Sequence, residues 1–178
     1  MSRIRIIGGD WRSRLIDVRT VKGLRPTPDR VRETLFNWLG QEMDGLRCLD
    51  LFAGSGALGF EAASRGAANV TMIEQDPVAL AALQTNAKTL QATCVQIVRG
   101  DALNFARSTT QPFDVVFVDP PYRAGWIDRI APLLPKLLSD EGLVYVEAEY
   151  KIDNIDRLTR IKHGAAGQVY YHLFARAD

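Results

Sequence analysis

The strongest constraint on the fold is an alternation of apolar strands and helical stretches that begins at residue 46. Strand-like runs occur at 46–52, 70–74, 94–99, 113–118 and 142–147, and helical patterns lie between them at about 57–65, 77–90, 102–107 and 126–138. Nearly continuous apolar strands separated by helices are typical of a parallel sheet that is covered on both faces. The pattern therefore predicts a doubly wound, Rossmann-like α/β fold.

Both ends of the chain depart from this alternation. Residues 3–7 and 14–18 are predicted to pair as a small hairpin, and "LRPTPDRVRETLFNWLG" reads as a helix with Thr27 as its N-cap. At the other end, "IDRLTRIKHG" and "GQVYYHLFAR" predict an antiparallel hairpin at one edge of the sheet. Within it, Tyr170 and Tyr171 point to opposite faces, so we expect one of them to be buried.

Charge divides the chain unevenly. Residues 1–32 carry nine basic and three acidic side chains, a net charge of +6, and the remainder has a net charge of −5. Arginine outnumbers lysine eight to one in the first segment. Since the planar guanidinium suits phosphate, the segment indicates contact with a polyanion, although a solvated, flexible start explains the composition almost as well. We expect a basic extension at 1–24 and a main domain at 25–178.

Other features of the sequence bear on disulfide bonds, metal binding and cellular location. Cys48 and Cys94 stand alone, without the spacing of a disulfide framework or a zinc site, and His163 and His172 have no evident metal or triad partners. No signal peptide and no long apolar stretch is visible, so we expect a cytoplasmic protein with no membrane contact and no metal.

A glycine-rich turn stands at the first strand-to-helix junction, in "LDLFAGSGALGFEA". Gly54, Gly56 and Gly59 match GxGxxG directly after a strand, which is the context in which a helix N-terminus receives a nucleotide. Both a dinucleotide and another nucleotide-like cofactor are compatible with this spacing.

Carboxylates at the strand ends bear on that choice. Glu74 ends the second strand of the alternation and Asp101 follows the third, so both are expected at the edge where open α/β sheets bind ligands. Asp50 lies inside the first strand, just under the glycine turn, where an anion opposes a pyrophosphate and favours a cation. S-adenosylmethionine carries a cationic sulfonium and amino group, so the pattern favours it over NAD.

The stretch "VVFVDPPY" ends the fourth strand of the alternation with an acid, two prolines and an aromatic ring. Pro120 and Pro121 remove backbone donors and leave outward-facing carbonyls. Together with the Asp119 carboxylate, these acceptors suit an exocyclic amine, whose nitrogen they can orient towards an electrophilic methyl group. Tyr122 is expected to stack on the base that carries the amine.

These motifs resemble the class I methyltransferases that act on amino nitrogens. "RIIGGDWRSRLI", "LRPTPDRVRETLFNWL" and "DLFAGSGALGFEAASRGA" together resemble the bacterial 16S ribosomal RNA guanine-N2 methyltransferase family over essentially the whole chain. The resemblance implies methyl transfer from S-adenosylmethionine to the N2 amino group of one guanine in 16S rRNA. The implied partner is the small ribosomal subunit or its assembly intermediate, and a monomer is expected.

The resemblance also implies roles for individual residues. The catalytic loop is Asp119, Pro120, Pro121 and Tyr122. The implied cofactor-binding residues are Arg25, Thr27, Asp50, Phe52, Ala53, Gly54, Ser55, Gly56, Glu74, Gln75, Asp101 and Ala102. The implied RNA-binding residues are Arg3, Arg5, Arg12 and Arg14.

Three alternative functions stay open. An amino-group methyltransferase for DNA adenine or protein glutamine shares this loop, although the glutamine enzymes are expected to have Asn where Asp119 stands. A non-catalytic RNA-binding assembly factor can keep the fold. An NAD-dependent oxidoreductase explains the glycine turn and leaves the DPPY loop without a role.

Overall fold

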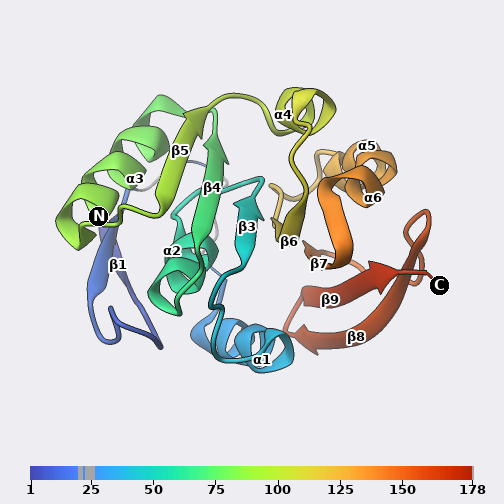
Figure 1. Ribbon diagram of the computed structural model, residues 1–178, viewed down its shortest axis with the longest axis horizontal. Helices are drawn as coiled ribbons and strands as arrows, with labels where there is room; N and C mark the ends of the chain where they lie inside the picture. Colours follow the sequence, from blue (N-terminus) through green and yellow to red (C-terminus); the bar gives the residue numbers. More distant parts are fainter. Residues whose placement is uncertain (20–21, 23–26, 178) are drawn as a thin grey trace.

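A seven-stranded sheet forms the centre of the protein, in the order β5-β4-β3-β6-β7-β9-β8 (Figure 1). The computed structural model describes residues 1–19, 22 and 27–177. The strands are β3 (Arg47–Asp50), β4 (Asn69–Glu74), β5 (Val95–Arg99), β6 (Phe113–Val118), β7 (Leu138–Ala148), β8 (Leu158–Ala166) and β9 (Val169–Arg176). Strands β3 to β7 are parallel, and β9 is antiparallel to both of its neighbours. The predicted doubly wound sheet with an antiparallel C-terminal hairpin is confirmed.

Helices cover both faces of this sheet. They are α1 (Asp29–Leu39), α2 (Ala57–Ser64), α3 (Pro77–Leu90), α4 (Ala102–Ser108), α5 (Trp126–Ile130), the 3-10 turn η1 (Ala131–Leu133) and α6 (Leu134–Leu137). Helices α1, α2 and α3 share one apolar core with one face, and α4, α5 and α6 share a second core with the other. Successive residues alternate between the two cores along each strand: Val115 and Phe117 of β6 lie in the first, and Val116 and Val118 in the second.

Two helix predictions are wrong. Thr27 does not cap α1, which begins at Asp29 after Pro28 and has no side-chain cap; the Thr27 hydroxyl instead bonds two carboxylates in the site. The single helix predicted over 126–138 is divided into α5, η1 and α6, because Pro132 and Pro135 each lack an amide donor. Strand β7 then begins at Leu138, which pairs with Phe113 of β6.

The predicted N-terminal hairpin is present as β1 (Ser2–Arg5) and β2 (Leu15–Val18). Its apolar side chains, Ile4, Ile16 and Val18, are buried in the same core as α1, α2 and α3. The Asn86 side chain of α3 exchanges two hydrogen bonds with the backbone of Asp17, at 3.1 and 2.8 Å. The hairpin is therefore packed into the main fold, and the expected boundary between residues 24 and 25 lies outside the described residues.

A buried carboxylate joins this hairpin to α1 and α2. Glu61 of α2 is fully buried and accepts the backbone N–H groups of Ile7 at 2.9 Å and Gly8 at 2.8 Å. It also accepts from Arg65 Nε at 2.9 Å and from the buried Arg32 of α1 at 3.4 Å. Through these four donors, Glu61 links the N-terminal hairpin, α1 and α2.

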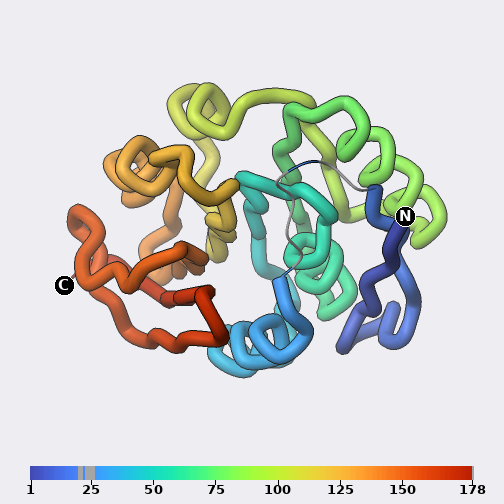
Figure 2. Tube along the Cα trace, turned by 180° about the vertical axis from the view of Figure 1, so that it is seen from behind, coloured from blue at the N-terminus to red at the C-terminus, as the bar shows by residue number. Residues whose placement is uncertain are grey.

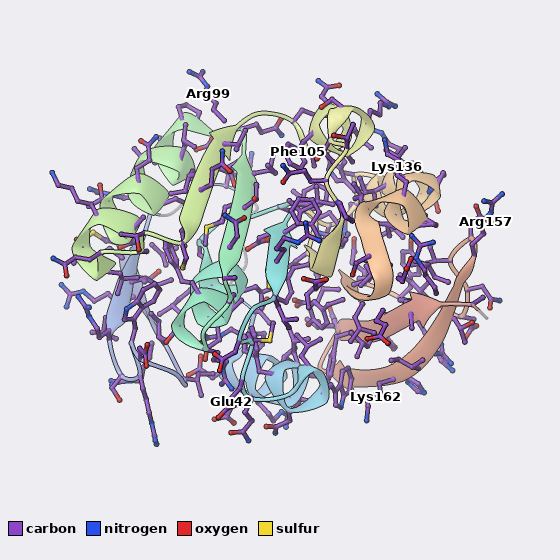
Figure 3. All side chains as sticks on the ribbon, in the orientation of Figure 1. Glu42, Arg99, Phe105, Lys136, Arg157 and Lys162 are labelled. Carbon is purple, nitrogen blue, oxygen red and sulfur yellow. The ribbon has the colours of Figure 1, made fainter. Side chains whose placement is uncertain are left out.

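The two hairpins lie at opposite ends of the long axis of the molecule, as both views show (Figures 1 and 2). Arg99 at the end of β5 and Arg157 before β8 point outward, whereas Phe105 points from α4 towards the sheet (Figure 3). None of the described helices is both long enough and apolar enough to span a membrane.

Candidate active site

A cavity of about 1160 Å³ opens at the edge where the parallel strands end. Its lining comes from segments far apart in the sequence: the glycine turn after β3, the end of β4, the loop after β6, the end of β7 and the turn between β8 and β9. The lining residues that the sequence predicted are Thr27, Asp50, Phe52, Ala53, Gly54, Ser55, Glu74, Gln75, Ala102, Asp119, Pro120, Pro121 and Tyr122. The sheet thus brings the two predicted motifs to one cavity.

Close packing at Gly56 and a hydrogen bond at Gly54 fix the backbone conformation of the glycine turn. Gly56 has a φ of 82°, and a β-carbon there would lie 2.6 Å from the side chains of Phe60 and Leu83. Glu74 Oε2 accepts the Gly54 N–H at 2.8 Å, so the end of β4 fixes the turn from beside it. The turn therefore presents close-packed backbone to the cavity, as a nucleotide-like cofactor requires.

Asp50 lies under this turn with only 1% of its surface exposed. Its Oδ2 accepts the Gly59 N–H at 3.1 Å, and its Oδ1 has no hydrogen-bond partner among the described residues. Burial, together with the charge of Glu74, raises the pKa of Asp50 to about 7 against the Gly59 hydrogen bond that lowers it. A buried carboxylate oxygen with unused acceptor capacity at the cavity wall suits a cationic ligand, so these residues fit S-adenosylmethionine.

The remaining predicted cofactor residues are held locally. Asp101 caps α4 by accepting the Asn104 N–H at 3.0 Å, and it lies between Gly100 and Ala102, which both line the cavity. Gly56 lies in the turn without lining the cavity. Arg25 lies outside the described residues. The roles assigned to these side chains stay predictions.

The DPPY loop follows β6 directly and carries Asp119 into the cavity. The Thr27 hydroxyl lies 3.2 Å from Asp119 Oδ2 and 2.8 Å from Glu147 Oε2. Desolvation, followed by the charges of Glu147 and Asp50, raises the pKa of Asp119 well above its ordinary value. Burial also raises the pKa of Glu147, against the Thr27 hydrogen bond.

Aromatic rings line the same cavity as this carboxylate pair. Tyr122, Trp126 and Tyr170 line the same cavity, and Trp126 packs edge-on against Phe52 with ring centroids 5.2 Å apart. Of the tyrosines in β9, Tyr171 is buried in the core and Tyr170 faces the cavity, as the alternation predicted. The cavity therefore combines acceptors with flat apolar surfaces, which suits a nucleobase.

Glu147 is the site residue that the sequence reasoning missed. It ends the "LVYVE" run of β7 and is 3% exposed at the cavity wall. The signal was available, because an acid that closes a buried strand had already singled out Asp119. His172, in contrast, is structural as expected: its ring bonds the backbone of Ile152 and Val146, both at 3.0 Å.

The predicted RNA-binding arginines do not line the cavity. Arg3, Arg5, Arg12 and Arg14 all lie exposed on the N-terminal hairpin, where Arg3 pairs with Asp17 at 3.0 Å. No group of side chains suited to a metal ion occurs in the part of the chain that the structure describes.

The sheet order, the glycine turn over a buried acid and the acceptor loop beside it define a class I methyltransferase, which takes its methyl group from S-adenosylmethionine. The chain belongs to the family described as Conserved hypothetical protein 95, whose model matches residues 4–175. This membership confirms the family resemblance drawn from the sequence.

Individual relatives agree with this assignment. The chain is 45% identical over 179 residues to Ribosomal RNA small subunit methyltransferase D of Escherichia coli strain K12, covering 98% of this chain and 90% of that protein. A solved candidate methyltransferase from Escherichia coli has 46% identity and a TM-score of 0.89, covering 98% of both chains. A solved candidate methylase from Haemophilus influenzae has 37% identity and a TM-score of 0.85, covering 99% of this chain and all of the other.

Proposed function

We propose that the protein transfers a methyl group from S-adenosylmethionine to the N2 amino group of a guanine in 16S rRNA of the small ribosomal subunit. The observation that carries this proposal is the Asp119 carboxylate, which stands in the same cavity as the glycine turn and beside two prolines without amide donors. The Escherichia coli relative, named as a small subunit rRNA methyltransferase, supports the substrate class.

The residues of the chain supply positioning and charge stabilisation. Asp119 and the proline carbonyls accept the N–H groups of the amine and direct its nitrogen lone pair towards the methyl carbon. Transfer breaks the bond between that carbon and sulfur, forms a carbon–nitrogen bond and releases one proton from N2. Asp119 faces the positive charge that develops on nitrogen and stabilises it, and the pair of acids with raised pKa values can accept the released proton.

A base that is stacked inside an RNA helix cannot reach this cavity, so the target guanine must first leave its stack. Tyr122, Trp126 and Tyr170 offer ring faces or edges against which an unstacked base can pack. Asp50 lines the same cavity under the glycine turn, and its buried oxygen without a hydrogen-bond partner suits the cationic cofactor.

The N-terminal hairpin carries the proposed contact with RNA phosphate. Its arginines are exposed, and they extend from a body that is net negative. Because phosphate contacts release counterions, this contact should depend on salt. A cytoplasmic monomer that acts on the small subunit or on its assembly intermediate completes the proposal.

The direct test is to incubate the protein with methyl-labelled S-adenosylmethionine and small subunits that lack their methyl groups, then digest the RNA and identify the labelled nucleoside. Label on N2-methylguanosine is the expected result. Label on another nucleoside, or on none although the cofactor binds, rejects the proposal.

Variants test the catalytic loop in the same assay. Asp119→Ala should lower turnover by about 100- to 1000-fold, the cost of removing one preorganised group that stabilises developing charge. Binding of S-adenosylhomocysteine should persist. Asp140→Ala, which removes an exposed acid of β7 outside the cavity, is the matched control and should leave turnover unchanged.

A further inference from the structure

Strand register sets Glu147 beside Asp119. Strands β6 and β7 are parallel, with Phe117 opposite Tyr145 and Val118 opposite Val146. The next residue on each strand is an acid, and the alternation that buries Phe117 and Tyr145 in one core directs both acids to that same side. Two carboxylates thus reach the cavity from neighbouring strands.

Thr27 ties these two acids together. Its single hydroxyl group lies within hydrogen-bond distance of both, at 2.8 Å from Glu147 and 3.2 Å from Asp119. A hydroxyl has one proton to donate, so it cannot satisfy both carboxylates. The Tyr145 hydroxyl also approaches Glu147. Because a carboxylate has about four acceptor sites, acceptor capacity is still left over on both acids, and Glu147 is nearly inaccessible to bulk water.

The bases differ in what stands next to their amino group. In guanine the N2 amine adjoins the N1–H group, so two neighbouring positions donate hydrogen bonds. In adenine and cytosine the amine adjoins an unprotonated ring nitrogen, which accepts. A single carboxylate holds the amine of any of the three bases, whereas a second carboxylate beside it attracts N1–H and repels an unprotonated ring nitrogen.

We propose that Glu147 determines base specificity, accepting the N1–H of guanine while Asp119 accepts the N2 amine. This inference rests on the proposed function and assigns the choice of guanine to a residue of this chain. The two carboxylates that accept from the base then lie at the ends of neighbouring strands, so the sheet fixes the spacing between them. The Thr27 hydroxyl contacts both carboxylates and helps to keep them side by side.

Electrostatics agree with this arrangement. The raised pKa values of Asp119 and Glu147 reflect desolvation and, for Asp119, the charge of its neighbour. Two carboxylates so close together favour sharing a proton. Guanine brings three N–H donors, one on N1 and two on N2, which satisfy both carboxylates without that proton. Adenine brings only two N–H donors, both on its amino group, and its unprotonated ring nitrogen places an acceptor against the second carboxylate.

The test replaces the target guanine in the RNA by 2-aminopurine, which keeps the 2-amino group but has an unprotonated N1. The wild-type protein should methylate the guanine RNA about 10- to 100-fold faster than the 2-aminopurine RNA, because a hydrogen bond to a charged group contributes about that factor. Glu147→Gln keeps the shape of the side chain and adds an N–H donor that suits an unprotonated N1. The guanine preference of this variant should fall by about 10- to 100-fold.

Controls separate specificity from structure. Asp140→Asn makes the same change of acid to amide on the same strand but outside the cavity, so its guanine preference should stay as in the wild type. Equilibrium binding of the same two RNAs, followed by 2-aminopurine fluorescence and competition, gives the preference without turnover. Retained S-adenosylhomocysteine binding shows that the Glu147→Gln variant is folded.

The outcomes distinguish this inference from the proposed function. If the wild-type protein forms no N2-methylguanosine, the proposed function fails. If it does, and Glu147→Gln keeps the wild-type preference in turnover and binding, only the role of Glu147 is overturned. A preference shifted towards 2-aminopurine supports it.

Discussion

Replacing Glu61 by alanine should destabilise the protein severely. The carboxylate is fully buried and accepts from two backbone N–H groups and two arginine side chains, so its loss leaves four donors without that partner. Arg32 is itself fully buried, and Arg65 is 8% exposed. Removing one partner of a buried ion pair costs about 3–5 kcal/mol, because the remaining charge cannot reach water. Arg32 keeps its ion pair with Asp29 at 2.7 Å, so Arg65 and the two backbone N–H groups account for most of the expected loss. We therefore expect Glu61→Ala to lower the free energy of unfolding by about 3–5 kcal/mol.

Urea unfolding followed by circular dichroism measures this change, and the melting temperature should fall by roughly 6–20 °C for a chain of this length. Arg3→Ala is the matched control on the same hairpin. Its ion pair with Asp17 is exposed on both sides and should contribute about 1 kcal/mol or less. A loss for Glu61→Ala no larger than that of the control would refute the reasoning that this carboxylate holds the hairpin, α1 and α2 together.

Three further predictions follow from single features. Gly9→Ala should lower the free energy of unfolding more than Gly45→Ala does. Both glycines have a φ of 77°, so the backbone strain is the same in the two variants. A β-carbon at Gly9 would lie 1.9 Å from the Ser64 carbonyl oxygen, whereas none of the described atoms lies within 4 Å of a β-carbon at Gly45. Thermal melts of the two variants check this, and equal losses would contradict it. Ionised Asp50, with its pKa of about 7, favours the cationic cofactor, so affinity for S-adenosylmethionine should fall several-fold from about pH 7.5 to about 6 as the carboxylate gains a proton. Calorimetry should show a flatter pH profile for Asp50→Asn. Replacing the hairpin arginines by alanine should reduce the salt slope of RNA binding, and an unchanged slope would move the RNA contact elsewhere; these arginines are Arg3, Arg5, Arg12 and Arg14.

The sheet and the position of the cavity were predictable because they depend on local signals. Apolar runs separated by helices fix a parallel sheet, and parallel strands end at one edge, so Asp50, Glu74 and Asp119 had to lie near one another. That one of Tyr170 and Tyr171 is buried while the other lines the cavity likewise followed from strand alternation, although the alternation did not say which.

Other features depend on contacts that no local pattern records. A threonine before a proline and an acid looks the same whether it caps a helix or, like Thr27, bonds two distant carboxylates. Glu61 sits in an apolar helix, and its backbone partners lie 53 and 54 residues earlier in the chain. The partnership of Asp119 and Glu147 required the register of β6 against β7, which depends on tertiary pairing.

The same long-range contacts constrain the order of events during synthesis. The hairpin leaves the ribosome before the residues that bind it in the folded protein. Glu61, the partner of Gly8, follows it by 53 residues, and Asn86, the partner of Asp17, follows it by 69 residues. At typical elongation rates of about 5–20 residues per second, the synthesis of these 69 residues lasts roughly 3 to 14 s. Throughout it the nascent chain exposes Ile4, Ile16 and Val18, the side chains that are buried in the finished protein. The segment that we propose to contact ribosomal RNA therefore exposes its apolar side chains during synthesis until these downstream partners have been made.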